Sequence, residues 1–257
     1  MIVYKSLREI NIIKEGAEIL SKTLGEVSKY IKEGVTTQYL DKIAEEFILD
    51  NKAISAFKNY NGFPATLCIS INNEVVHGLP SNRSLKDGDI VSIDCGVKYK
   101  GYYSDSAYTF PVGNVSKEAS KLLDITKESL FVGIANFNKG SYLMDLGSSI
   151  QNFVEANGFN VVRSLVGHGI GKKLHEEPNV PNYKDFDSRF YVKAGLVVAI
   201  EPMVVCGDYS LTQSKDGWTI VTLDGSLAAH FEHTVAVYED KTEILTNFAY
   251  IEERLKI

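Results

Sequence analysis

The chain has little cysteine and no long apolar run, and both shortages narrow the class of protein. Its 257 residues include three cysteines, Cys68, Cys95 and Cys206, which lie far apart and form no CxxC pair. Such an odd, scattered set is typical of free thiols in a reducing compartment. No stretch approaches the roughly 18 consecutive apolar residues of a membrane span, and the first residues lack the apolar core of a signal peptide. We therefore expect a cytoplasmic protein with no membrane partner.

The chain also lacks an excess of basic residues. It has 27 Lys and Arg against 33 Asp and Glu, for a net charge of −6. With no Lys/Arg-rich run, this balance argues against a nucleic-acid partner. The chain is 44% hydrophobic and 23% charged, as in ordinary globular proteins. No Pro/Ser-rich linker interrupts it, so we predict a single domain over residues 1–257.

One pattern occurs twice in the chain. The segments KDGDIVSID (86–94) and KAGLVVAIE (193–201) share the pattern K-x-G-x-(I/V)-V-small-I-acid, 107 residues apart (193 minus 86). Upstream, apolar positions of 34–48 match those of 140–154 at an offset of 106 (140 minus 34). Because two separated blocks agree, we predict two pseudo-repeats, about 8–112 and 117–240, related by a pseudo-twofold axis.

Periodicity predicts an α+β fold in which each repeat has a helix pair followed by strands. Helices are expected at 8–33, 36–51, 117–137 and 142–157. Extended segments are expected at 64–76, 89–97, 102–110, 159–166, 195–206, 218–223 and 229–238. Residues 179–192 are expected to form a surface loop.

A glycine-rich segment at 166–178, VGHGIGKKLHEEP, holds two of the five histidines. Gly167 and Gly169 flank His168, and Gly171 follows closely. Three glycines so close together argue against a helix interior, where each costs about 1 kcal/mol relative to alanine. They predict a loop that turns tightly or lets another group approach closely. A histidine on such a loop can reach a metal or a substrate.

Carboxylates recur at matched places in the two repeats. Asp94 ends the first duplicated strand and Asp105 lies on the next one. A hairpin centred on residues 98–101 would place them directly opposite each other, where like charges are destabilising. A divalent cation is the natural counter-charge for such a pair. The alternative is that one aspartate points to solvent.

The second repeat adds two more carboxylates. Glu201 matches Asp94 through the repeat, and Glu232 lies inside the apolar segment FEHTVAV. A charge in such a segment is costly unless it is paired or bound to metal. Symmetry therefore predicts four inward carboxylates, with His168 as a fifth donor. That is too many carboxylates for one cation and favours two ions.

These segments resemble the methionine aminopeptidases. The resemblance is carried by GHGIGKKLHEEP (167–178), IEPM (200–203), FEHT (231–234) and the pair of aspartates eleven residues apart. NGFP (61–64), SINNEVVHGLP (70–80) and DGWT (216–219) strengthen it, and it extends from about residue 5 to residue 247. Only 31 positions separate Glu201 from Glu232, which leaves no room for the helical insertion of the type 2 enzymes. The chain therefore resembles type 1, whose pita-bread fold has an internal twofold symmetry.

The resemblance implies a dinuclear metal centre. Two divalent ions would be bound, with Asp105 and Glu232 bridging both. The mixed donor set suits Co, Mn, Fe or Zn. A bridging water, its pKa lowered by the cations, would attack the first peptide bond as hydroxide. Glu201 would pass a proton to the leaving amine. The implied ligands are Asp94, Asp105, His168, Glu201 and Glu232.

The resemblance also implies the substrate contacts. His175 would hydrogen-bond the substrate backbone and steady the tetrahedral intermediate, and His77 would contact the scissile amide region. A methionine side chain needs an apolar pocket in which its sulfur meets ring edges. The resemblance assigns that pocket to Tyr60, Phe63, Cys68 and Trp218.

Several positions call for separate predictions. Leu174 and His230 stand where the family's bacterial members commonly have an aromatic residue and a glutamine. Because strand alternation directs residues 230 and 232 to the same face, we predict that His230 lies near the site without binding metal. His233 and Cys95 are expected to be packed on the opposite faces of their strands. Glu176 and Glu177 are either solvated or orient the histidine loop.

The predicted function is removal of the initiator methionine from nascent proteins, with a preference for a small second residue. We expect a monomer that acts on N-terminal Met peptides and contacts the ribosome at most transiently. One alternative is an Xaa-Pro aminopeptidase or prolidase, which usually carries an additional N-terminal domain. The other is a non-catalytic binding protein of the same fold, although such relatives lack several metal ligands.

Overall fold

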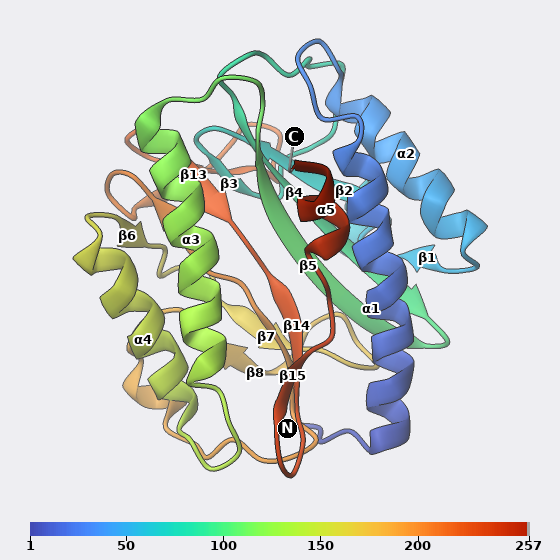
Figure 1. The fold of residues 1–257 in the computed structure, drawn as a ribbon, viewed down its shortest axis with the longest axis vertical. Helices are drawn as coiled ribbons and strands as arrows, with labels where there is room; N and C mark the ends of the chain where they lie inside the picture. The colour runs from blue at the N-terminus through green and yellow to red at the C-terminus, as the bar shows by residue number, and fades with distance from the viewer. Residues whose placement is uncertain (256–257) are drawn as a thin grey trace.

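The computed structural model describes residues 1–255, in which two helix pairs lie on either side of a set of antiparallel strands (Figure 1). The four predicted helices are found within a few residues of their expected bounds, except that the first ends five residues early, at Ser28, and a C-terminal helix at Ala249–Leu255 was not predicted. A capping box between Ser6 and Glu9 starts α1, as expected for Ser followed three residues later by Glu. None of the helices in this described part is long and apolar enough to cross a membrane. The helices are α1 (Leu7–Ser28), α2 (Thr37–Asp50), α3 (Lys117–Ala135), α4 (Leu143–Ala156) and α5 (Ala249–Leu255).

The strands form small antiparallel sheets between the helix pairs. In the first, β4 (Ile90–Tyr99) pairs with β1 (Ile54–Ser55), β2 (Leu67–Ile71) and β5 (Tyr102–Pro111). The second has the order β15-β14-β9-β7-β8, with bounds Thr242–Ile244, His233–Val237, Val197–Ile200, Gly167–Gly169 and Glu176–Val180. The third joins β13 (Ala228–His230), β10 (Met203–Val205) and β6 (Asn160–Val161). The fourth joins β11 (Leu211–Gln213), β12 (Ile220–Thr222) and β3 (Glu74–Val76).

The register of the β4–β5 hairpin differs from the predicted one. Asp94 lies opposite Ala107 and Asp105 lies opposite Gly96. The connection has only two residues, Lys100 and Gly101, with φ values of 47° and 84°. Two consecutive positive φ values are those of a type I′ turn, which moves the centre of the hairpin by one residue. The prediction of direct opposition was therefore wrong. The two aspartates are diagonal neighbours, and they still share one face of the sheet.

Two predicted strands of the second repeat are interrupted. The segment 195–206 forms β9 and β10, which belong to different sheets and are separated by Glu201 and Pro202. Proline has no N–H to donate to a ladder, so regular pairing ends there. The segment 229–238 likewise forms β13 and β14, with Phe231 and Glu232 between them. The prediction of continuous strands was wrong at both places, and each break coincides with a predicted metal ligand.

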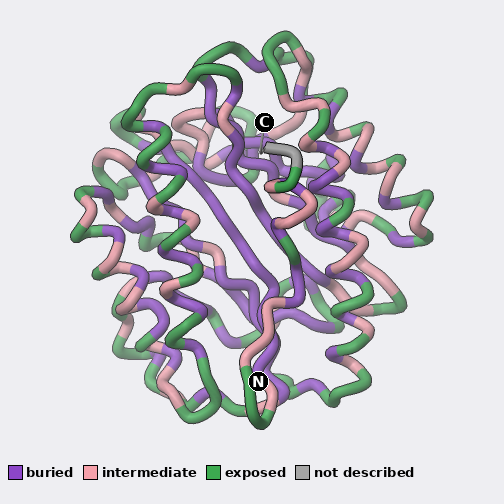
Figure 2. The backbone as a smooth tube through the Cα atoms, viewed as in Figure 1, coloured by how far each residue is buried: buried purple, intermediate pink, exposed green. Residues whose placement is uncertain are grey.

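The core lies between the helix pairs and the strands, where the backbone is buried almost throughout (Figure 2). Leu20 of α1, Phe110 of β5, Leu122 of α3 and Val235 of β14 belong to one continuous apolar cluster, so the halves share a core. Helices α2 and α4 have 14 residues each and begin 106 positions apart (143 minus 37). These features agree with the duplication, and the single domain with its repeat boundaries stays a prediction.

Candidate active site

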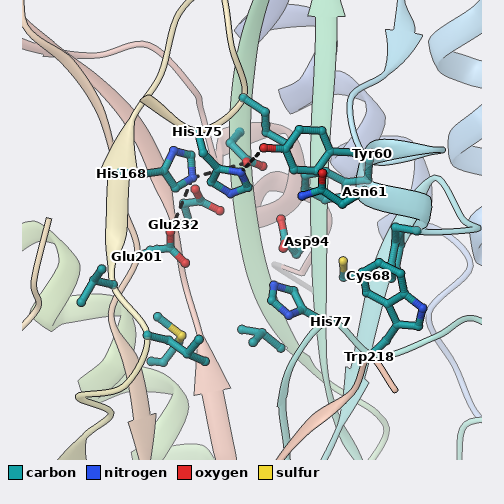
Figure 3. Close-up of a pocket in the computed structure, with 18 residues that line it drawn as sticks. Tyr60, Asn61, Cys68, His77, Asp94, His168, His175, Glu201, Trp218 and Glu232 are labelled. Carbon is teal, nitrogen blue, oxygen red and sulfur yellow. Dashed lines mark hydrogen bonds and ion pairs between the residues drawn. The ribbon is translucent and has the colours of Figure 1, made fainter. Parts of the chain in front are cut away.

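A cavity of about 270 Å³ is lined by residues of both halves. It brings together every side chain predicted above to bind metal or substrate (Figure 3). Buried acidic groups lie on one side of the cavity, whereas His77 and His175 are exposed to solvent at its opening. The predicted residues on its wall are Tyr60, Phe63, Cys68, His77, Asp94, Asp105, His168, His175, Glu201, Trp218 and Glu232.

Three buried side chains form the centre of the acidic cluster. Asp105, His168 and Glu232 each offer one ligand atom, and these atoms all lie within 4.8 Å of one another. Nε2 of His168 is 3.9 Å from Oδ2 of Asp105 and 3.7 Å from Oε1 of Glu201. Asp94 shares the hairpin face with Asp105 and lines the same cavity. Segments far apart in the sequence thus converge on one oxygen-rich site.

The electrostatics of this cluster favour a cation. Burial raises the pKa of Asp94 to about 7 and that of Glu201 to about 8. Burial and the neighbouring carboxylates also raise the pKa values of Asp105 and Glu232 well above the ordinary range. Burial lowers the pKa of His168 to about 3, so its imidazole is neutral and can act as a donor to metal.

Unpaired acceptors give an independent test of fit. Within residues 1–255, Oδ1 of Asp94 and Oε1 of Glu232 are buried and have no hydrogen-bond partner. A buried acceptor without a partner costs about 1–3 kcal/mol, and more when it is charged. Hard carboxylate oxygens around a neutral imidazole are the donors that divalent ions bind. The residues present therefore fit divalent metal ions.

His168 lies on a strand, not on the loop that its glycines predicted. Gly167, His168 and Gly169 form β7, between β8 and β9. A Cβ at 167 would lie 2.4 Å from the carbonyl oxygen of Ala199, and one at 169 would lie 2.3 Å from that of Glu177. The glycines therefore permit close strand approach, which was the second of the two expected reasons.

His175 is held by a partner that the sequence did not reveal. Its Nδ1 is 2.8 Å from the hydroxyl of Tyr60, and its ring centroid is 4.3 Å from that of His168. With Nδ1 engaged by Tyr60, Nε2 is left for a group in the cavity. Desolvation lowers the pKa of His175, which favours the neutral ring.

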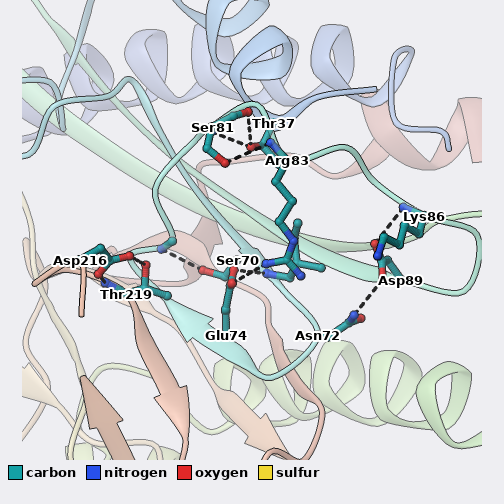
Figure 4. A network of polar contacts seen from close by, with 12 residues as sticks. Thr37, Ser70, Asn72, Glu74, Ser81, Arg83, Lys86, Asp89, Asp216 and Thr219 are labelled. Atoms are coloured by element: carbon teal, nitrogen blue, oxygen red, sulfur yellow. Dashed lines mark hydrogen bonds and ion pairs between the residues drawn. The ribbon is translucent and has the colours of Figure 1, made fainter. Parts of the chain in front are cut away.

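The position of His77 is fixed by its backbone conformation and by the hydrogen bonds of the next residue. Its φ of 59° is uncommon outside glycine. The next residue, Gly78, accepts a hydrogen bond from the N–H of Ile69 at 2.8 Å and donates one to Oγ of Ser70 at 3.1 Å. A Cβ on Gly78 would lie 2.1 Å from the carbonyl oxygen of Ile69. The contact between Ser70 and Gly78 belongs to a polar network that includes Glu74 and Arg83 (Figure 4).

The apolar side of the cavity is aromatic. The rings of Phe63 and Trp218 meet edge to face at 5.2 Å. The Asp216 carboxylate accepts the Trp218 backbone N–H at 2.9 Å, which closes the turn that presents the indole. Cys68 lies opposite Asp94 on the neighbouring strand, so the apolar pocket adjoins the carboxylates. Leu174 is buried and lines the cavity where the resemblance led us to expect an aromatic side chain.

Comparison with known proteins identifies the family. A model of metallopeptidase family M24 matches residues 11–239, most of the chain. The chain belongs to this family. A methionine aminopeptidase of Clostridium perfringens is 52% identical, over 96% of this chain and 99% of that protein. These findings confirm the predicted family.

Solved structures of M24 relatives place the fold. The methionine aminopeptidase of Thermotoga maritima superposes with a TM-score of 0.94 at 42% identity, covering 96% of this chain and 100% of that one. A prolidase of Pyrococcus horikoshii gives a TM-score of 0.76 at 22% identity. That superposition covers 95% of this chain but only 63% of the prolidase. That second likeness shows the fold alone. The predicted α+β pita-bread class is confirmed.

Two histidines of this M24 chain lie where strand alternation predicted. Nε2 of His230 is buried, 3.4 Å from Oε2 of Glu201, so His230 does lie near the site. His233 is directed away from it: its Nδ1 is 2.7 Å from Oγ1 of Thr246, and its ring stacks on Phe248. Cys95 is fully buried in the core, as expected.

Other residues that shape this M24 site were missed. Asn182, within the predicted surface loop, is fully buried and donates through Nδ2 to the Glu201 carbonyl at 3.0 Å. The Glu176 side chain is buried while Glu177 is exposed. The structure thus distinguishes two residues for which the sequence gave the same pair of alternatives. No periodicity marks these positions, since each depends on a distant neighbour. Six further lining residues had been assigned no role, although four of them lie inside the quoted motifs. Phe57 and Leu165 lie outside those motifs, whereas Asn61, Val76, Val166 and Met203 lie within them.

Proposed function

We propose that this chain is a metal-dependent aminopeptidase that removes methionine from the N-termini of proteins. The observation that carries the proposal is the placement of a buried carboxylate–histidine cluster beside an aromatic apolar pocket in one cavity. Near-full-length relatives named methionine aminopeptidase support it. A terminal residue whose side chain fills the apolar pocket would place its carbonyl close to the cluster.

We propose that Asp94, Asp105, His168, Glu201 and Glu232 hold two divalent ions, with Asp105 and Glu232 shared between them. Co, Mn, Fe and Zn all suit this donor set. When bound, such ions lower the pKa of water so that hydroxide is available near neutral pH. Their charge would also return the carboxylates to the ionised form.

The chain's own residues supply the other steps. Glu201 reaches the cluster through Oε1 and His230 through Oε2, so its carboxylate can take up a proton and deliver it to the leaving amine. His175, oriented by Tyr60, would donate to the substrate carbonyl oxygen as negative charge develops there. His77 would face the scissile amide and crowd a large second residue. Tyr60, Phe63, Cys68 and Trp218 would enclose the methionine side chain.

The cellular setting is proposed on narrower grounds. Unpaired cysteines, two of them buried, agree with a reducing cytoplasm. The substrates would be N-terminal Met peptides of nascent proteins, with at most transient contact with the ribosome. We propose a monomer, since the cavity is built from one chain.

A peptide panel tests the function. Metal-free protein reconstituted separately with Co²⁺, Mn²⁺, Zn²⁺ and, anaerobically, Fe²⁺ should hydrolyse Met-Ala-Ser faster than Met-Leu-Ser, and should leave Ala-Ala-Ser nearly untouched. Hydrolysis of Ala-Ala-Ser as fast as Met-Ala-Ser would sink the methionine assignment. Cleavage confined to Xaa-Pro peptides would favour the prolidase-like alternative. Failure to bind or use any of the four metals would favour a binding protein.

A further inference from the structure

A buried ion pair joins the N-terminal segment to the histidine loop, outside the metal cluster. Nζ of Lys5 is 2.8 Å from Oε2 of Glu176, and the two side chains are only 2% and 8% exposed. Surface ion pairs contribute little, but a buried pair that loses one partner leaves an uncompensated charge. The position of each chain segment therefore depends on the other.

Both members of the pair are also tied to the backbone. The Lys5 N–H donates to the carbonyl oxygen of Gly195 at 2.6 Å, which holds the N-terminal segment beside the second repeat. Oε1 of Glu176 accepts the N–H of Lys173 at 3.0 Å, which closes the loop on itself. The segment runs from the N label toward α1 along the lower edge of Figure 1.

The third glycine of the histidine segment is explained by this pair. A Cβ on Gly171 would lie 2.5 Å from Cε of Lys5 and 2.9 Å from Oε1 of Glu176. Position 171 has no room for a Cβ because the Lys5 side chain passes over it, whereas Gly167 and Gly169 permit close packing of neighbouring strands. The same short motif thus serves two structural purposes.

The loop beyond Gly171 carries two residues of the cavity. Residues 172–175 form bends between β7 and β8, without ladder pairing in the described structure. Leu174 is buried in the apolar cluster that also includes Ile10 and Ile13 of α1. His175 is exposed, so its position depends on Tyr60 and on the path of the loop. Glu176 follows it directly, and Lys5 holds Glu176.

We propose that Lys5, through Glu176, is a positioning residue that sets the place of His175 and Leu174 in the cavity. The proposal rests on the function proposed above. The N-terminal segment thereby becomes part of the active-site structure, although it touches neither metal nor substrate. A displacement of His175 by about 1 Å is enough to lower turnover by as much as 100-fold.

The test compares Lys5→Met with Lys172→Met. Lys172 lies on the same loop, but its side chain is 69% exposed and its Nζ lies 3.7 Å from Oε1 of Glu9. Because this ion pair is exposed to solvent, Lys172→Met is the matched control. We expect Lys5→Met to lower kcat on Met-Ala-Ser about tenfold or more while metal content stays at the wild-type level. Hydrogen exchange of amides 171–176 in the metal-free protein should rise in this variant. Lys172→Met should match wild type in both readouts.

A second variant covers the case in which Lys5→Met does not fold. Glu176→Gln keeps one oxygen that can accept the Lys173 N–H, but it replaces the carboxylate oxygen at Lys5 with an NH2 group, which cannot accept. It should therefore show the same loss of kcat and the same local exchange. Val27→Ala in the core serves as a destabilised variant that should keep wild-type kcat.

Wild-type kcat and wild-type exchange in a folded Lys5→Met or Glu176→Gln variant would overturn the proposal. Loss of kcat in the Val27→Ala variant as well would also overturn it, because the effect would then follow global stability. If the wild-type protein cleaves no Met peptide, the function proposed above fails. The exchange of amides 171–176 would still report whether Lys5 holds the loop.

Discussion

The two halves of the molecule supply their carboxylates from different backbone structures. In the first half, Asp94 and Asp105 lie within two ten-residue strands that pair along their whole length. In the second half, Glu201 follows β9 and Glu232 precedes β14, each at an interruption between two strands. The duplicated sequence therefore gives equivalent acidic positions without equivalent strands.

The interruptions are compensated by specific contacts. The Glu232 N–H donates to the Ala107 carbonyl at 2.9 Å, and Oγ of Ser106 donates to the Glu232 carbonyl at 2.7 Å. Asn182 supports the Glu201 carbonyl in the same way. Regular pairing between β4 and β5 holds the first pair of carboxylates, with Thr234 of the second half hydrogen-bonding the outer backbone edge of Asp105. Individual side chains and the first-half hairpin hold the second pair without a regular ladder. Buried backbone groups at a strand break need such partners.

The largest expected effect concerns the cluster itself. Asp105→Asn and Glu232→Gln should each lower metal affinity and kcat/KM more than about 100-fold. This exceeds the loss of about 10- to 100-fold that is typical when a residue that only supports a metal ligand is replaced. Titration calorimetry with Mn²⁺ and peptide hydrolysis measure both quantities. Asp208→Asn, on an exposed loop, is the control. Retention of both ions by Glu232→Gln would break the comparison, because the second half would then supply no shared ligand.

The second prediction separates the two kinds of support. Asn182→Ala should lower metal affinity about tenfold, since an outer contact of Glu201 is lost. Ser92→Ala removes a buried hydroxyl contact of 2.8 Å with Thr109 inside the regular hairpin. It should cost about 1 kcal/mol of unfolding free energy and leave metal affinity unchanged. Equal metal affinity in both variants would show that the strand break needs no such support.

The third prediction concerns pH. The pKa values of Asp94 and Glu201 rise from 3.8 and 4.5 to about 7 and about 8. Between about pH 4 and pH 8 these two groups therefore bind more protons in the metal-free folded protein than in the unfolded chain, so their contribution to the unfolding free energy falls as pH rises. Below this window the two states are equally protonated at these sites, and the contribution is fully present.

Urea unfolding with a chelator present, from about pH 5 to about pH 8.5, measures this slope. Asp94→Asn should remove the part of the fall in unfolding free energy that ends near pH 7. Glu201→Gln should remove the part of that fall that ends near pH 8. Saturating Mn²⁺ should flatten the curve, because the ions replace the protons. A pH dependence of stability in both variants that equals that of the wild-type protein would contradict the assigned burial.

The smallest effect is expected at His230. Because its Nε2 contacts Glu201 from outside the cluster, His230→Ala should retain the full metal content. His230→Gln, which restores a donor of similar reach, should lie closer to wild type in kcat/KM than His230→Ala does. Metal analysis of the purified proteins checks the first statement, and loss of one ion in His230→Ala would refute it.

Much of this organisation was predictable because it depends on local chemistry. Apolar periodicity placed the helix pairs, and the repeated pattern ending in Asp94 and Glu201 placed the carboxylates. The separation of His230 from His233 was predicted correctly, although the strand assumed to carry both is broken between them. The errors lie where local rules meet tertiary contacts. A Lys-Gly turn does not carry the usual Asn-Gly signal of a type I′ hairpin, so the register was missed.

The sequence by itself determined the family, the helix pairs, and the identity of the acidic and histidine residues in the cavity. These properties follow from residue type and spacing along the chain. Only the tertiary structure decided that Glu201 and Glu232 lie at strand breaks, that Asn182 supports Glu201, and that Lys5 joins Glu176. Burial and hydrogen bonding between segments more than 100 residues apart, as for Lys5 and Glu176, leave no periodic mark in the sequence. They exist only once the chain has folded.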